Sequence, residues 1–222
     1  MLCKCKKEVL KWDYLDFGFV ELEDFMGDED VILKGAYVCT QKNIEEKTDE
    51  EKQATLKYII RNNHNTPLEH IKIRLRLKLP KFVMIQLGRY RSQVYNELSQ
   101  RYNNIAKNDL YIPNEIKGIS DKKKIEEIQN IIRHSYSSSI SAYKVLLSEG
   151  MKKEQARIVV PMGIYTEIIQ TIDLRSLLHV IDERLNTHAQ YEIQELAKIF
   201  KEIVKKIVPK FSELYFGLEN EI

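Results

Sequence analysis

The chain has 222 residues, of which 43% are hydrophobic and 31% charged, a balance typical of a globular protein rather than a disordered one. Its 35 lysines and arginines nearly match its 33 acids, and the net charge of +2 excludes a general attraction to nucleic acid, so any anion site must be local. No apolar run approaches the roughly 18 residues that a membrane span requires, and the charged start is unlike a signal peptide.

The three cysteines are too few for a disulfide framework. Cys3 and Cys5 form a lone C-x-C near the start, which we interpret as free thiols in a reducing, cytoplasmic setting. Cys39 follows an apolar segment, and we expect it to be a small buried residue. No further cluster of cysteine and histidine completes a zinc site, so the sequence predicts no metal.

The first part of the chain is predicted to form a short strand at 17–22 and a helix over 27–38. A clearer helix over 48–63 begins with a capping box of Thr48 and Glu51, and Pro67 interrupts the helical pattern after it. Residues 71–80 then alternate strictly between apolar and cationic side chains, which is the pattern of a half-buried strand.

Five cations accompany this alternating strand: Lys72, Arg74, Arg76, Lys78 and Lys81. The simplest interpretation is a solvated face of a sheet. The alternative is an interface with an acidic or phosphate-bearing partner.

A short helix over 81–88, closed by Gly88, is predicted next, followed by a loop that returns to strand at 99–103. A long amphipathic helix over 120–150 has Gly150 as its stop, and a brief helix covers 152–160. Helices over 173–185 and 189–209 complete the pattern, the second being the last major helix. The expected fold is α/β (α+β) with a helical majority, in one domain over 1–222 with a helical portion at about 121–160.

Polar residues that interrupt these patterns are the candidates for function. They form three groups along the chain: His64, Thr66, Glu69 and His70; Arg89, Arg91, Glu97, Ser99 and Arg101; Arg157, Arg175, His179, Arg184 and His188. A lone histidine or arginine is usually structural. Several arginines beside apolar faces nevertheless predict an anionic ligand, because buried charge is costly without a counter-charge and guanidinium groups match phosphate oxygens.

Other kinds of chemistry have little support in the sequence. Ser99 lies outside any G-x-S-x-G frame, and no base is evident beside it, so nucleophilic catalysis is not predicted. There is no phosphate-binding loop and no G-x-G-x-x-G, so a dinucleotide would not be bound in the Rossmann manner.

The segment RYRSQVYNELS, residues 89–99, resembles with one change the R-H-R-x7-S signature of the flavin-dependent thymidylate synthases. Four flanking segments resemble that family in order and spacing: TPLEH at 66–70, ELSQRY at 97–102, ARIVVP at 156–161 and LRSLLHVIDERLNTHAQYEI at 174–193. The likeness runs from about Phe19 to Pro209. Several ordered motifs are a far more specific signal than the signature alone.

The resemblance implies a central, mostly antiparallel sheet flanked by long helices, and a specific reaction. Members of the family methylate dUMP to dTMP: methylenetetrahydrofolate supplies the carbon, FAD relays the hydride and NADPH reduces the FAD. They are homotetramers with active sites between subunits. No enzyme cysteine attacks the pyrimidine, which fits a chain whose cysteines look incidental.

Site residues follow from the resemblance position by position. The residues implied to surround dUMP are Gln86, Arg89, Glu97, Ser99, Arg101, Arg157 and Arg184. The residues implied for the FAD site are Thr66, Glu69, Arg89, Tyr90, Arg91, Asp173, Arg175, His179 and His188. His64 and Tyr102 would lie near the flavin and the folate, and Arg184, Ser99 and His64 are the candidate catalytic residues. Arg184 would favour the ionised uracil ring.

The chain also departs from the family pattern. Tyr90 replaces the signature histidine, Leu87 and Gly88 stand where two aromatics are usual, Asp173 stands for an asparagine, and Cys39 stands for a serine. We therefore expect normal dUMP binding but weaker FAD binding, unless Tyr90 stacks on the flavin.

Two alternatives remain open. One is the same fold acting on another pyrimidine nucleotide, or as a flavin-poor, nucleotide-binding relative. The other is a nucleic-acid-binding module that uses the basic strand, disfavoured by the small net charge and the lack of a stacking platform.

Overall fold

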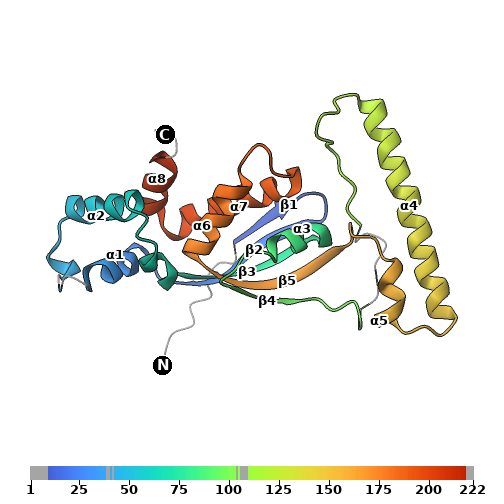
Figure 1. The fold of residues 1–222 in the computed structure, drawn as a ribbon, viewed down its shortest axis with the longest axis horizontal. Coiled ribbons are helices and arrows are strands. Elements are labelled where there is room, and N and C mark those ends of the chain that lie inside the picture. The colour runs from blue at the N-terminus through green and yellow to red at the C-terminus, as the bar shows by residue number, and fades with distance from the viewer. Residues whose placement is uncertain (1–9, 39–40, 42, 104, 106–109, 219–222) are drawn as a thin grey trace.

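The computed structural model describes residues 10–38, 41, 43–103, 105 and 110–218. Cys3, Cys5 and Cys39, on which the cysteine interpretation depends, lie outside these residues. Figure 1 shows a central sheet with α1, α2 and α8 at one end and α4 and α5 at the other. Within the described part of the chain, no helix is both long and apolar enough to cross a membrane.

The sheet has five strands, and every pair of neighbours is antiparallel. In spatial order they are β1 Leu10–Tyr14, β2 Gly18–Met26, β3 Lys72–Pro80, β5 Tyr165–Asp173 and β4 Gln93–Glu97. The predicted alternation places β3 at the centre, with Ile73, Leu75, Leu77 and Leu79 fully buried on one face. The expected fold class, helices with a mostly antiparallel sheet, is confirmed.

The cations of β3 lie on its other face, where acids of the neighbouring strands pair with them. Arg76 contacts Glu167 of β5 at 2.8 Å, and Arg74 contacts Glu23 of β2 at 3.3 Å. Lys81, at the end of the strand, pairs with Glu97 of β4. These contacts favour the interpretation of an exposed, charge-compensated sheet face over that of a nucleic-acid surface.

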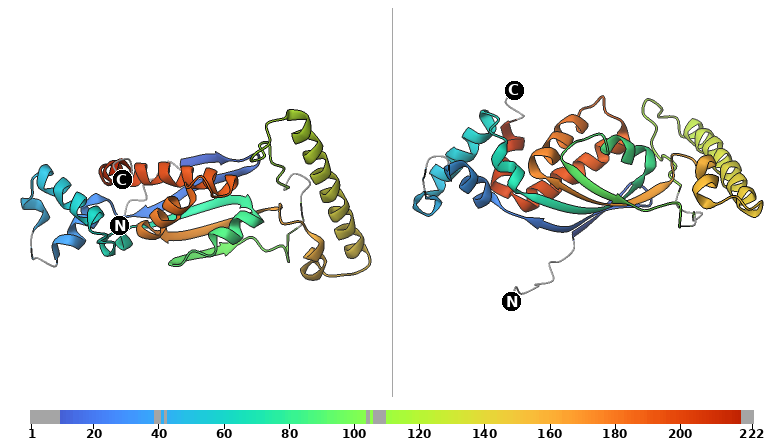
Figure 2. Two further views of the ribbon diagram at one scale, coloured as in Figure 1. Left: turned by 45° about the horizontal axis from the view of Figure 1, so that its top comes forward. Right: turned by 60° about the horizontal axis from the view of Figure 1, so that its bottom comes forward.

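Helices cover the opposite face of the sheet, as the two views of Figure 2 show. The longer helices are α1 Glu29–Val38, α2 Asp49–Arg61, α4 Lys122–Ser148, α6 Leu174–Arg184, α7 Tyr191–Ile207 and α8 Pro209–Leu218. The shorter ones are α3 Lys81–Leu87, α5 Lys153–Ala156 and the 3-10 turns η1 Ile44–Glu46, η2 Thr66–His70 and η3 Arg157–Val159. The predicted apolar faces of α6 and α7 are buried against the sheet, and the capping box of Thr48 and Glu51 begins α2.

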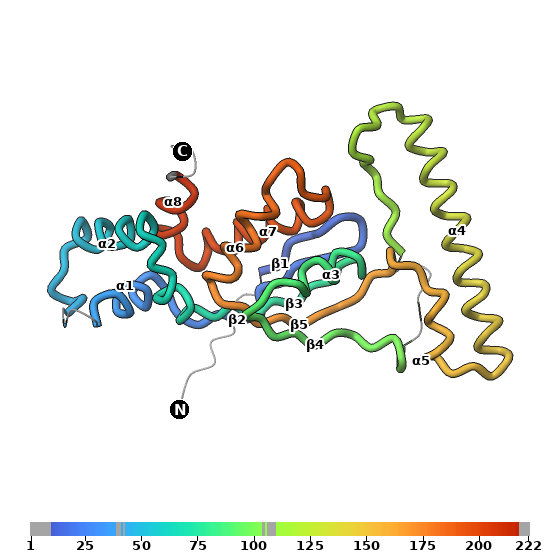
Figure 3. The backbone as a smooth tube through the Cα atoms, in the orientation of Figure 1, coloured from blue at the N-terminus to red at the C-terminus, as the bar shows by residue number. Residues whose placement is uncertain are grey.

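The long helix α4 stands beyond the end of the sheet (Figure 3). Only one of its side chains, that of Tyr143, is buried. Tyr136 attaches α4 to the body by donating a hydrogen bond to the carbonyl of Tyr111 at 3.0 Å. A Cβ at Gly163 would lie 1.9 Å from the Tyr136 hydroxyl, so only glycine fits beneath this contact.

The structure corrects the predicted elements in several places. The strand expected at 99–103 is wrong, because these residues form turns and the strand is β4 at Gln93–Glu97. β4 is an edge strand with three largely exposed residues, so it carries no apolar alternation. β5 was missed because Thr166 and Gln170 lie among the buried residues of its inner face, and β1 and α8 were also not predicted.

Candidate active site

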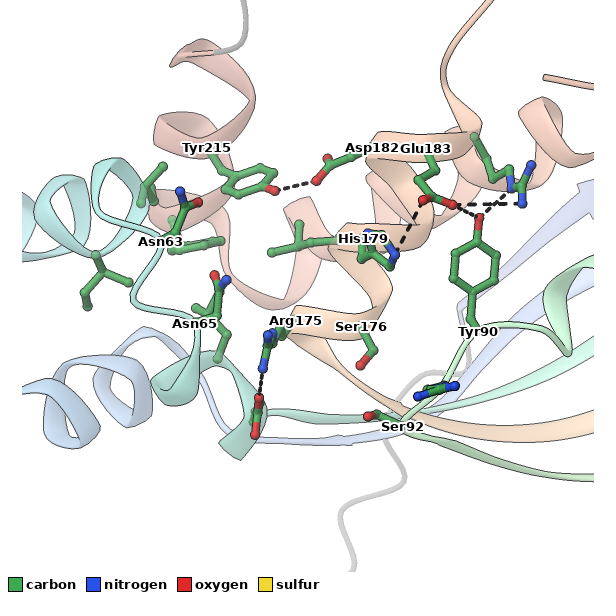
Figure 4. A pocket seen from close by; sticks show the side chains of 18 of the residues that line it. Asn63, Asn65, Tyr90, Ser92, Arg175, Ser176, His179, Asp182, Glu183 and Tyr215 are labelled. Carbon is green, nitrogen blue, oxygen red and sulfur yellow. Dashed lines mark hydrogen bonds and ion pairs between the residues drawn. The ribbon is translucent and has the colours of Figure 1, made fainter. Parts of the chain in front are cut away.

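A cleft of about 680 Å³ lies where α2, η2 and α6 meet the turn between α3 and β4 (Figure 4). We name it the arginine cleft. Its ionisable lining residues are Glu69, Arg89, Tyr90, Arg91, Arg175, His179, Asp182, Glu183, Arg184 and Tyr215. Apolar side chains from α2, η2, α6 and α8 complete it: Ile59, Ile60, Leu68, Leu178 and Phe211. The cleft therefore combines arginine cations with an apolar wall.

Helix α6 supplies one wall through its periodicity. Arg175, His179 and Glu183 recur every four residues and share the cleft face, while Leu177 and Ile181 are buried on the other side. His179 Nε2 lies 3.6 Å from Glu183 Oε1, and Arg175 forms an ion pair with Glu69 of η2. The predicted common face of Arg175 and His179 is confirmed.

Residues 89–92 form the opposite wall, and two glutamine amides hold this turn in place. Gln93 Nε2 donates to the carbonyls of Leu87 at 2.7 Å and Tyr90 at 2.8 Å. The Gln93 oxygen in turn accepts a hydrogen bond from Gln170, which is fully buried in β5. Ser92 adopts a positive φ of 60°, which reverses the chain into β4. The turn is thus fixed to the sheet.

Tyr90 lies between the two walls. Its hydroxyl donates to Glu183 Oε2 at 2.7 Å and accepts from Arg184 Nε at 2.5 Å. The guanidinium of Arg184 lies 5.3 Å from the centre of the ring, and the His179 ring meets it edge to face at 5.6 Å. Burial, followed by the hydrogen bond to Glu183, raises the pKa of Tyr90 to about 12. The phenol is therefore neutral near pH 7.

A second cleft, of about 840 Å³, lies at the other end of the sheet, and we name it the serine cleft. Its polar lining residues are Lys81, Glu97, Ser99, Gln100, Glu154, Gln155 and Arg157. Glu97 accepts hydrogen bonds from Lys81 and, at 2.9 Å, from Thr166. Arg101 pairs with Glu154 at 3.0 Å beside this cleft.

The residues implied for the flavin site largely come together. Glu69, Arg89, Tyr90, Arg91, Arg175 and His179 all line the arginine cleft. The residues implied for dUMP are divided: Arg89 and Arg184 line the arginine cleft, whereas Glu97, Ser99 and Arg157 line the serine cleft. β4 joins the two linings: Ser92, just before it, lines the arginine cleft, and Glu97, at its end, lines the serine cleft, roughly 17 Å further on at about 3.3 Å a residue. One copy of the chain does not bring the dUMP set together.

Three further predicted flavin residues lie outside the lining of the arginine cleft. Thr66 begins η2, and His188 is exposed beyond the end of α6. Asp173 is 4% exposed and caps α6 by accepting a hydrogen bond from the Ser176 N–H at 2.8 Å. Lys72, at 3.5 Å, is its ion-pair partner, while Arg175 pairs with Glu69. Their contacts with flavin stay predictions.

The remaining predicted site residues line neither the arginine cleft nor the serine cleft. His64 is exposed and stacks on Tyr58, with 5.4 Å between the rings. Gln86 Nε2 donates to Gln190 Oε1 at 2.6 Å, and Tyr102 is exposed beyond the serine cleft. The roles of His64, Gln86 and Tyr102 stay predictions.

The sequence patterns missed Glu183, Gln93 and Gln170. Glu183 could have been found from its spacing, because it lies four residues after His179 as His179 lies four after Arg175. The glutamine pair has no sequence signal, because Gln93 and Gln170 are 77 positions apart.

Comparison with known proteins places these clefts in a family. A family model described as thymidylate synthase complementing protein matches residues 21–210. A flavin-dependent thymidylate synthase of Pseudothermotoga lettingae is 35% identical over 213 residues, covering 94% of this chain and 95% of its own. This chain belongs to the flavin-dependent thymidylate synthase family. The resemblance found in the sequence is thereby confirmed.

Further relatives of the same family agree. The flavin-dependent thymidylate synthase of Thermotoga neapolitana is 38% identical, with 87% of this chain and 90% of its own covered. The fold also matches a crystal structure of the UMP/dUMP methylase PolB from Streptomyces cacaoi bound with 5-Br dUMP. That match has a TM-score of 0.82 and 22% identity, and it covers 93% of this chain and 97% of the other.

Proposed function

We propose that this chain is a flavin-dependent thymidylate synthase that methylates dUMP to dTMP and holds FAD in the arginine cleft. One observation carries the proposal. Six residues implied for the flavin site line this one cleft: Glu69, Arg89, Tyr90, Arg91, Arg175 and His179. They come from η2, the turn after α3, and α6, which are far apart in the sequence. The family of the chain supports the same activity.

The chemistry of the cleft fits a large anionic cofactor. Its four arginines outnumber its three carboxylates, so it carries a positive charge before a ligand binds. The apolar side chains from α2 and α6 offer a surface for an aromatic ring. A bound flavin supplies hydride transfer, with NADPH as the reductant and methylenetetrahydrofolate as the carbon donor. Arg89, Arg91 and Arg175 would hold its negative groups.

The dUMP site is shared between copies of the chain in this proposal. Its Ser99 and Arg157 lie at one end of the sheet and its Arg89 and Arg184 at the other, so one copy must offer its serine cleft to the arginine cleft of another. A closed homotetramer satisfies this arrangement, because symmetric assembly repeats the same contact at every site. The exposed apolar rim of the serine cleft supports an interface there.

Arg184 has the central catalytic role in the proposed reaction. Its side chain is 28% exposed and lines the arginine cleft, and its Nε donates a hydrogen bond to Tyr90. Facing the uracil, it would stabilise negative charge that develops on the ring and so favour reaction at carbon-5. Such a donor typically contributes 100-fold or more to the rate.

The purified protein provides a direct test. We expect a yellow protein that converts dUMP to dTMP when methylenetetrahydrofolate and NADPH are supplied, and an Arg184→Ala variant that loses about 100-fold or more in rate while unfolding at the same temperature. A folded protein that binds no FAD and forms no dTMP would refute the proposed function. Turnover of UMP but not dUMP would move the assignment to another pyrimidine nucleotide.

A further inference from the structure

The Tyr90 hydroxyl forms hydrogen bonds with both Arg184 and Glu183, and contact with a flavin alone would not require either bond. Its hydroxyl is 2.5 Å from Arg184 Nε and 2.7 Å from Glu183 Oε2 (Figure 4). The two partners are neighbours on α6, whereas Tyr90 comes from the turn before β4. One oxygen atom therefore joins the two walls of the arginine cleft.

The direction of these hydrogen bonds is fixed by the groups involved. A guanidinium can only donate, and a carboxylate can only accept. The Tyr90 hydroxyl must therefore accept from Arg184 and donate to Glu183, which requires the phenol to keep its proton. With a pKa of about 12, the hydroxyl stays protonated near pH 7.

The arrangement leaves the terminal Nη atoms of Arg184 available to a ligand. Tyr90 occupies the Nε–H, and its ring lies 5.3 Å from the guanidinium carbon. The Nη2 atom is 3.9 Å from Glu183 Oε2, too far for a hydrogen bond, so the Nη fork retains donors for a ligand. His179 Nε2 lies 3.6 Å from the other oxygen of Glu183.

We propose that Tyr90 and Glu183 are positioning residues that hold Arg184 by its Nε and turn its Nη fork toward the uracil of dUMP. This inference rests on the proposed function of Arg184. It assigns Tyr90 primarily to the nucleotide rather than to the flavin, and it gives a role to Glu183. A fixed guanidinium contributes more than a mobile one because no reorganisation is needed as charge develops.

Three variants separate the atoms of this arrangement. Tyr90→Phe removes only the hydroxyl, Glu183→Leu removes its acceptor, and Glu183→Gln keeps an acceptor without the charge. We expect Tyr90→Phe and Glu183→Leu each to lower kcat by about 10- to 100-fold, the usual effect of a hydrogen bond to a charged group. KM for dUMP should change little, since the bond acts mainly in the transition state, and Glu183→Gln should recover most of the rate.

Non-additivity tests whether the residues act as one unit. The double variant Tyr90→Phe plus Glu183→Leu should be no slower than the slower single variant. Tyr95→Phe, the same deletion on neighbouring β4, is the matched control and should keep its rate. Additive losses in the double variant would overturn the inference.

Two measurements on the protein without cofactor complete the test. In NMR spectra, the Nε–H resonance of Arg184, identified by its loss in Arg184→Ala, should exchange faster with water in Tyr90→Phe. Calorimetry should show that Tyr90→Phe changes the FAD dissociation constant by a smaller factor than it changes kcat. Weaker FAD binding with an unchanged kcat would make Tyr90 a flavin contact and overturn the inference. Full dTMP formation by Arg184→Ala would instead refute the proposed role of Arg184 itself.

Discussion

The arginine cleft and the serine cleft lie at opposite ends of β4 and differ in how far one chain completes them. The arginine cleft has walls from α2, η2, α6 and the turn before β4, and its charges are joined in a network around Tyr90. The serine cleft is bordered by apolar side chains that remain largely exposed: Leu98, Met151, Ile158 and Met162. Beyond it stands α4, with one buried side chain.

One chain supplies all the described walls of the arginine cleft, whereas the serine cleft keeps an exposed apolar rim. Exposed apolar side chains gathered around polar residues are typical of an interaction surface, because their burial drives association. The arginine cleft can hold its residues in place without help. In the proposed assembly, the arginine cleft of another copy completes the serine cleft.

Mixing two inactive variants tests whether the serine cleft of one copy and the arginine cleft of another form one active site. Arg157→Ala damages the serine cleft and Arg184→Ala damages the arginine cleft, so each alone should lose about 100-fold or more in dTMP formation. Subunits refolded together should regain activity in roughly a quarter of the sites, since random assortment pairs two intact clefts at that frequency. Activity of the mixture no higher than that of its components would show that the clefts do not combine.

A charge on the serine-cleft rim should weaken assembly. Ile158 is 83% exposed, so Ile158→Asp leaves the core of one chain intact. In the proposed interface, the buried carboxylate should raise the dissociation constant of the assembly by about 10- to 100-fold, measured by light scattering across a dilution series. Val38→Asp, a change at a residue that is 71% exposed on α1 and lines neither cleft, is the matched control. An unchanged assembly in both variants would place the interface elsewhere.

Alkaline pH should destabilise the fold through buried phenols at the serine-cleft end. Burial raises the pKa values of Tyr111 and Tyr165 above their ordinary value, and a hydrogen bond to Asp16 adds to the effect at Tyr165. The unfolded chain therefore loses these protons at lower pH than the folded chain. The free energy of unfolding should keep its full value below about pH 10. Above that pH it should fall by up to about 1.4 kcal/mol per pH unit for each phenol.

Denaturant unfolding between pH 9 and pH 11 measures this decline. Tyr165→Phe should reduce its slope, whereas Tyr58→Phe, at an exposed position on α2, should leave the slope unchanged. An equal slope in the wild type and Tyr165→Phe would contradict the assignment to the buried phenols.

The smallest expected effect on stability concerns the cap of α6, the helix that supplies one wall of the arginine cleft. Asp173→Ala should lower the free energy of unfolding by about 1–2 kcal/mol, because the Ser176 N–H loses its acceptor. Asp173→Asn should cost less, since asparagine is an equally good cap. It should also bring little gain in FAD affinity, because Lys72 already pairs with the carboxylate. A large gain, measured by calorimetry, would support the weaker FAD binding expected from the sequence.

The sequence by itself determined much of this protein. The alternation of Ile73, Leu75, Leu77 and Leu79 placed β3, and the period of α6 placed Arg175 and His179 on one face. These features are local, since a side chain's face follows from backbone geometry within a few residues. Ordered motifs over most of the chain were enough to indicate the family, which the comparisons confirm.

Only the tertiary structure decided how the candidate residues are distributed. The Tyr90 hydroxyl meets Glu183 and Arg184 across more than 90 positions, and Gln93 meets Gln170 across 77. The same long-range arrangement divided the dUMP residues between two clefts. These pairings depend on which strands become neighbours in the sheet, and the packing of the whole core sets that order rather than any local pattern.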